Sequence, residues 1–254
     1  MHDIHMAGVT KDFVSCWKAA GLHIQNQAQG PIQSWLRAHL NPPFLEHLSF
    51  RLGNQLFYLQ LEDVDGRLYT PGNPEGLLTI ADGCAGYACV MPMRKIGSDW
   101  EPTEPGWGLL DARTRKPINP AALISDEKIV MTDWELQDFA VQVVRDQLAK
   151  EGRKLMSWNG DPGVNPSIWF VGDAGPEWVV VRAVRDPAVE ADLPNNLAEM
   201  KAHFNKLGHL GYFASVAMAS VDDPFDSQAI TNGNFVPLYH GHGMHVRYVG
   251  LQKL

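Results

Sequence analysis

The most conspicuous chemical feature of the chain is a histidine-rich segment, YHGHGMH, at residues 239–245. Residues two apart point to the same side of an extended strand, so His240 and His242 would share one face. His245 could approach them from beyond a turn loosened by glycine. Three imidazoles with an open coordination position suit Zn²⁺ or Ni²⁺. The same letters also fit a glycine-rich approach to a strand in which the histidines are ordinary surface or core residues.

The thiols and hydroxyls carry a weaker signal. Cys84 and Cys89 lie five apart in GCAGYAC, and Cys16 is distant from both. A C-x4-C spacing without a second cysteine pair is not typical of a zinc site, and three cysteines do not indicate a disulfide framework. We therefore expect small buried thiols. The sequence has neither a G-x-S-x-G nucleophile pattern nor a glycine-rich nucleotide-binding pattern.

Composition and charge favour some partners over others. The 254 residues carry a formal net charge of −8. Binding to the nucleic-acid backbone needs several cations opposite phosphates, so this balance disfavours nucleic acid and favours a protein partner. No apolar run reaches the roughly 18–20 residues of a membrane span, and the first residues do not resemble a signal peptide. The sequence thus predicts no membrane contact and a cytoplasmic location.

The stretch from Thr132 to about Asp186 organises the rest of the chain. Thr132 and Glu135 form a T-x-x-E capping box, which predicts the start of a long amphipathic helix. Its apolar positions fall on one helical stripe. The sequence then predicts three short strands at 155–158, 168–171 and 178–184, and a second helix at 195–207. A buried strand at 212–221 and a last strand at 244–251 follow.

The N-terminal part is predicted to be a separate α+β region. Its pattern predicts a helix that Gly21 interrupts and a second helix from Pro31 to Leu40. A hairpin follows at 48–66, with its turn at Gly53-Asn54. The segment 97–120 is rich in proline, glycine and charge, which is typical of a linker or a long surface loop.

Together these elements predict an α+β fold with two domains. Residues 126–254 would form a helix-β-β-β-helix-β core, in which helices flank a mixed central sheet. Residues 1–125 would form the α+β region that contains the hairpin, and the sequence gives it no role.

The order of elements, together with NPSIWFVGDAGPEWVVVRAV, resembles the PD-(D/E)XK, or restriction-endonuclease-like, nuclease family over roughly residues 132–221. In that family a helix Glu, an Asp after a Pro, and an acidic residue two positions before a Lys surround Mg²⁺. The resemblance implies Glu135 as the helix Glu and Arg182 in place of the Lys. Ser167 occupies the Asp position after Pro166, and Val180 occupies the acidic position.

The missing carboxylates lead to three functional hypotheses. The resemblance implies a nuclease-like scaffold without nuclease activity, hence a binding or regulatory protein that acts through a protein partner and needs no cofactor. The alternative is a Mg²⁺-dependent nuclease with a rearranged site made of Glu135, Asp173, Glu177 and Arg182. A third hypothesis is a metal-dependent enzyme or sensor, in which His240, His242 and His245 bind Zn²⁺ or Ni²⁺.

Overall fold

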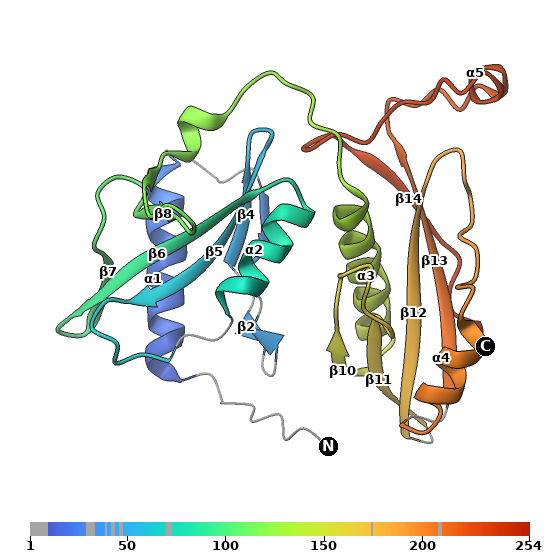
Figure 1. Ribbon diagram of the computed structural model, residues 1–254, viewed down its shortest axis with the longest axis horizontal. Helices are drawn as coiled ribbons and strands as arrows, with labels where there is room; N and C mark the ends of the chain where they lie inside the picture. The colour runs from blue at the N-terminus through green and yellow to red at the C-terminus, as the bar shows by residue number, and fades with distance from the viewer. Residues whose placement is uncertain are drawn as a thin grey trace. The chain divides into compact units, whose positions relative to one another are not determined.

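The computed structural model describes residues 10–28, 34–38, 40–41, 44–45, 48–69, 73–173, 175–207 and 210–254. The chain divides into two compact units, Met1–Lys128 and Ile129–Leu254. Each unit combines helices with a mixed β-sheet (Figure 1), so the predicted α+β class is confirmed.

The C-terminal unit follows the predicted order of elements. Its sheet has the strand order β10-β11-β12-β13-β14, and β15 also pairs with β13. The β12 and β13 strands are parallel, with α4 in the connection between them, whereas the other pairs are antiparallel. The elements are α3 (Asp133–Lys150), β10 (Lys154–Trp158), β11 (Ile168–Gly172), β12 (Gly175–Arg185), α4 (Leu197–Phe204), β13 (Leu210–Ser220), α5 (Ser227–Thr231), β14 (Met244–Tyr248) and β15 (Gln252–Lys253).

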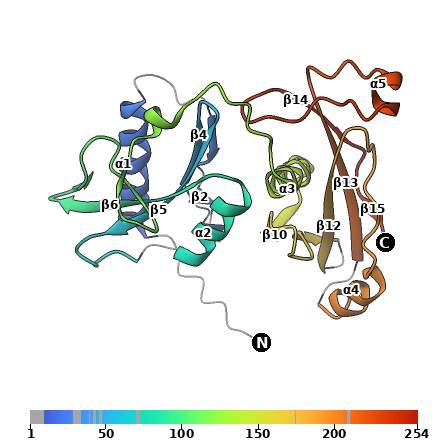
Figure 2. The same cartoon turned by 45° about the horizontal axis from the view of Figure 1, so that its top comes forward.

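The alternation of side chains along β12 gives this sheet an apolar layer on each face. Val179 and Val181 belong to the core that packs against α3, while Trp178 and Val180 belong to the core that packs against α4. Successive residues of a strand point to opposite faces, which is why β12 reads as a continuous apolar run. Figure 2 shows α3 and α4 on opposite sides of β12 and β13.

The capping box at the start of α3 is confirmed. The Thr132 hydroxyl accepts a hydrogen bond from the Glu135 backbone N–H at 3.2 Å, and Glu135 Oε2 accepts one from the Thr132 N–H at 2.7 Å. Two backbone donors that the first helical turn would leave unsatisfied are therefore paired.

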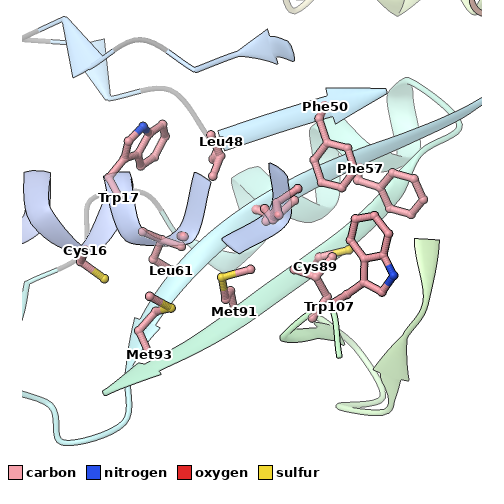
Figure 3. Packing of buried hydrophobic residues seen from close by; sticks show 14 of the residues in the cluster. Cys16, Trp17, Leu48, Phe50, Phe57, Leu61, Cys89, Met91, Met93 and Trp107 are labelled. Atoms are coloured by element: carbon pink, nitrogen blue, oxygen red, sulfur yellow. The ribbon is translucent and has the colours of Figure 1, made fainter. Parts of the chain in front are cut away.

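The N-terminal unit has a sheet of strand order β1-β4-β5-β6-β8-β9, in which β7 also pairs with β6. Cys16 and Trp17 of α1 belong to one buried cluster with Leu61, Met91 and Met93 of this sheet (Figure 3), and this cluster is the core of the unit. Its elements are α1 (Lys11–Gln27), β1 (Ser34–Arg37), β2 (Leu40–Asn41), β3 (Phe44–Leu45), β4 (Leu48–Leu52), β5 (Gln55–Asp63), α2 (Pro74–Gly83), β6 (Tyr87–Ile96), β7 (Asp99–Pro102), β8 (Leu109–Asp111), β9 (Pro117–Ile118) and a 3₁₀ turn, Pro120–Leu123.

The predicted hairpin is confirmed, and three other predictions for this region are wrong. Residues 34–37 of the predicted second helix form strand β1, because Trp35 pairs with Phe50 of β4. Residues 97–120 are not a linker: they form β7, β8 and β9, with Trp100 buried. Helix α1 also continues through Gly21 to Gln27.

The two units share one topology. Each begins with a helix and an edge strand, and continues with an antiparallel hairpin, β4–β5 in one unit and β11–β12 in the other. A helix then leads to a strand parallel to the second hairpin strand, β6 beside β5 and β13 beside β12. An antiparallel strand follows in both units. The same chain path is thus built twice from sequences in which no repeat is visible.

We predict that Gly21→Ala stabilises the protein by about 0.5–1 kcal/mol, because alanine restricts the unfolded chain and has the higher helix propensity. A Cβ at this position would meet nothing closer than Trp35 Cη2 at 4.0 Å. Urea unfolding measures the change. The control is Gly66→Ala, where a Cβ also meets nothing within 4 Å but φ is +66°. This control should destabilise, and stabilisation by both changes would contradict the explanation.

Candidate functional site

The Gln137 side chain closes the edge of β12 where β11 no longer pairs with it. The last residues paired between β11 and β12 are Ile168 and Val179. Beyond them, Gln137 Nε2 donates to the Val181 carbonyl at 2.9 Å, and Gln137 Oε1 accepts from the Ala183 N–H at 3.1 Å. Gln137 is only 5% exposed. Its amide thus does what a neighbouring strand would do, and it fixes α3 on the sheet.

Arg182 lies at the same edge and has only neutral hydrogen-bond acceptors. Its Nη1 donates to the Val181 carbonyl at 2.8 Å, and its Nη2 donates to Asn165 Oδ1 at 2.9 Å. None of the ion pairs in the described part of the chain includes it. Burial lowers the pKa of Arg182, although a guanidinium stays protonated in proteins. A partly buried cation without a counter-ion is unusual, because buried charges are normally paired.

A pocket of about 250 Å³ opens beside this guanidinium. It is lined by Asp133, Leu136, Gln137, Pro162, Arg182 and Ala183. The one carboxylate of this lining belongs to Asp133, which is held by Arg185 Nη2 at 2.8 Å and points to solvent with its side chain 94% exposed. The pocket therefore offers a guanidinium and an apolar wall, which is an arrangement suited to binding one small anionic group.

Glu135, predicted at the site, is engaged elsewhere. One of its carboxylate oxygens accepts the Thr132 N–H of the capping box. The other, Oε1, lies 2.8 Å from Nε2 of His240, and both side chains are buried. Glu135 does not line the Arg182 pocket, because the start of α3 and the C-terminal segment take both of its oxygens.

Asp173 and Glu177 lie at the other end of the hairpin. Asp173 is paired with Arg153 at 3.1 Å. Glu177 is buried, and it accepts a hydrogen bond from Tyr212, whose pKa is raised by burial and by this carboxylate. Glu177 and Arg182 lie five positions apart on β12, a distance of roughly 16 Å along a strand. The structure therefore does not bring Glu135, Asp173, Glu177 and Arg182 together, so it does not assemble the rearranged nuclease site.

The three histidines do not share a site either. His240 is buried against Glu135, whereas His242 lies 3.8 Å from Asp222 Oδ2 on the surface. His245 lies in β14 with its ring 5.8 Å from that of Phe225. Over the described residues, no three His, Cys, Asp or Glu side chains are grouped so that they could hold a metal ion. The predicted metal site made of His240, His242 and His245 is therefore wrong.

The physical reason lies in the backbone between the first two histidines. Gly241 adopts φ +77°, a left-handed conformation that turns the chain. The rule that residues two apart share a face holds only for an extended strand. Strand β14 begins at Met244, so His240 and His242 precede the strand.

The cysteines behave as expected. Cys16, Cys84 and Cys89 are free and buried. Burial, with a smaller contribution from Asp63, raises the pKa of Cys16 to about 12. The thiol is therefore protonated at neutral pH and is a poor nucleophile.

Two residues that shape the pocket were missed by sequence reasoning. Leu136 belongs to the apolar stripe of α3, and the polar residue Gln137 follows it directly. A polar side chain beside this stripe could have indicated a buried hydrogen bond. Asn165 precedes Pro166 in a loop, and no feature of the sequence predicts its contact with Arg182.

Comparison with known proteins finds a family match for the C-terminal unit. A family model described as a domain of unknown function (DUF8840) matches residues 134–254, and this range includes Gln137 and Arg182. No curated protein and no solved structure matches the chain. None of the helices in the described ranges has the length and apolar character needed to cross a membrane.

We predict that His240→Ala destabilises the protein by about 3 kcal/mol, because it leaves the Glu135 carboxylate buried without its partner. The matched control His242→Ala removes a surface ring and should change the free energy of unfolding by less than about 0.5 kcal/mol. Chemical denaturation measures both changes. Equal losses in the two variants, or one bound Zn²⁺ that either variant loses, would contradict this assignment.

Proposed function

We propose that the C-terminal unit is a non-catalytic binding module, which takes an anionic group of a protein partner into the pocket beside Arg182. The observation that carries this proposal is a partly buried guanidinium bonded only to neutral oxygens. Such a charge costs free energy in the unbound protein, and an incoming anion would offset that cost.

The order of elements supports a nuclease-like scaffold for this unit. A helix, an antiparallel three-stranded segment, a second helix and a parallel strand follow one another as the resemblance implies. Ser167 and Val180 are the residues at the two strand positions where the nuclease family has carboxylates. Mg²⁺ usually takes at least one or two carboxylates, and Asp133, which lines the pocket, is paired with Arg185. These facts favour binding over metal-dependent hydrolysis.

A carboxylate of a protein partner fits the pocket better than a nucleic-acid phosphate. The net charge of −8 repels a polyanion, and nucleic-acid binding gains affinity from many cations rather than one. A guanidinium can donate two parallel hydrogen bonds to one carboxylate. A volume of about 250 Å³ accommodates an acidic side chain or a chain terminus.

The binding site can be tested with acetate as the probe. We expect saturable NMR shifts at the Gln137 side-chain amide and the Arg182 Nε–H, because the carboxylate would bind beside both groups. Arg182→Gln should weaken acetate binding at least about tenfold, whereas Arg247→Gln, a control on exposed strand β14, should not change it. Absence of saturable shifts, or an equal loss in both variants, would contradict the proposal.

Incubation with DNA and RNA in the presence of Mg²⁺ or Mn²⁺ tests the competing nuclease hypothesis. We expect no cleavage above the buffer control, because the candidate carboxylates lie apart. Cleavage by the wild-type protein that disappears in Glu177→Ala would overturn the non-catalytic assignment. The Glu177 variant is informative only with a folded protein, so circular dichroism accompanies the assay.

A further inference from the structure

A second pocket, of about 160 Å³, lies at the end of β12. It is lined by Val130, Arg185, Asp186, Met218, Phe235, Val236, Pro237 and Leu238. Six of these eight residues are apolar, so the walls suit an alkyl chain. The charged groups of the lining are Arg185 and Asp186. A ligand would meet the charge of whichever of these two groups is not already paired with another residue of the protein.

Arg185 is already committed to other partners. Its Nη2 donates to the Met131 carbonyl at 2.6 Å and to Asp133 Oδ1 at 2.8 Å. Because Asp133 lines the Arg182 pocket and Arg185 lines this one, their ion pair stands between the two pockets. Arg185 therefore neutralises Asp133 and leaves the charge of Asp186 unbalanced.

Asp186 has a carboxylate oxygen without a hydrogen-bond donor. Its Oδ2 is buried, and among the described residues no donor reaches it. Burial and the nearby Asp223 raise the pKa of Asp186. A buried acceptor without a donor costs free energy, and such groups are uncommon in folded proteins.

Asp223 holds the loop that contributes the exposed Phe235 to this pocket. Asp223 Oδ1 accepts the Phe225 N–H at 2.8 Å, and Asp223 Oδ2 accepts the Val236 N–H at 3.3 Å, next to Phe235. Phe225 and Phe235 are 52% and 48% exposed. Phe225 adopts φ +52°, which is a strained conformation for a bulky side chain. Phe235 thus presents an aromatic ring at the pocket, where it can contact a cation.

The geometry points to the Asp186 pocket as a docking site for a lysine side chain of the protein partner. A four-carbon stem would lie along the apolar walls, and the ammonium would donate to Asp186 Oδ2. A metal ion fits poorly, because no group of three acidic, histidine or cysteine ligands exists in the described part of the chain. This inference rests on the proposed binding function and extends it to a second residue of the same partner.

The two pockets also indicate how the partner's charges are spaced. Asp186 directly follows β12, four positions after Arg182, and four extended residues span roughly 13 Å. An acidic group and a lysine separated by about this distance would occupy both pockets at once, and their effective concentration would raise the overall affinity.

The probe that tests this inference is n-butylammonium, which reproduces the lysine side chain. At pH 7 we expect saturable NMR shifts at Met218, Phe235 and Leu238. Asp186→Asn should weaken binding at least about tenfold, and the exposed α4 control Glu199→Gln should leave it unchanged. The Asn variant should fold at least as stably as the wild type, since it removes an unpaired buried charge. No saturable shift, or a Kd unchanged by Asp186→Asn, would overturn the inference.

Two further titrations separate the possible outcomes. The capped peptide acetyl-Gly-Lys-Gly-amide should bind about as tightly as n-butylammonium; binding of the amine alone would indicate a free small amine and overturn the lysine assignment. Acetate reports on the Arg182 pocket independently. Acetate binding without n-butylammonium binding would leave the proposed function standing and reject this inference, and the reverse would reject the proposed function.

Discussion

The hydrogen bonds between the Gln137 amide and β12 are the interaction on which the rest of the site depends. Strand β11 ends its pairing at Val179. Without Gln137 the N–H of Ala183 would lose its acceptor, and the carbonyl of Val181 would keep only the Arg182 guanidinium as a donor. A backbone N–H left without an acceptor away from water costs about 1–3 kcal/mol. A side chain from α3 satisfies both, so the helix is fixed to the sheet where a strand is missing. That missing strand leaves room for the Arg182 pocket.

The charges around this edge follow from the same arrangement. Arg185 is neutralised by Asp133, whereas Arg182 and Asp186, four residues apart, keep charges that no described side chain balances. Hydrogen bonds from Arg182 to two neutral oxygens offset part of the cost of burying its charge. A protein selected for stability alone would replace such groups with apolar ones. Their presence at the C-terminal end of β12 is therefore the physical basis for inferring a binding surface.

The sequence predicted elements whose signals are local. The capping box of Thr132 and Glu135, the stripe of α3 and the Gly53-Asn54 turn each depend on residues close in the chain, and the structure contains all three. The errors came from distant contacts: Trp35 is in a strand because it pairs with Phe50, and Trp100 is buried by strands that bring 97–120 onto the sheet. The prediction that Gly21 interrupts the helix was wrong for a local reason, since helix packing there overrides the modestly lower helix propensity of glycine.

The site was less predictable than the fold. Arg182 was singled out only through a resemblance, and its partner Asn165 comes from a loop that no pattern connects to it. The histidine prediction failed at a single residue, Gly241, whose left-handed backbone removes the strand geometry that the prediction assumed. The topology shared by the two units is likewise carried by strand pairing and not by similar residues.

The free energy of unfolding of wild type and Arg182→Gln, with and without acetate, tests the central claim most directly. If Arg182 is kept for binding, the variant should differ from wild type by less than about 1 kcal/mol without acetate. Acetate at ten times its Kd should stabilise wild type by about 1.4 kcal/mol and the variant hardly at all. A loss above about 3 kcal/mol that acetate does not alter would make Arg182 a structural residue and contradict the account.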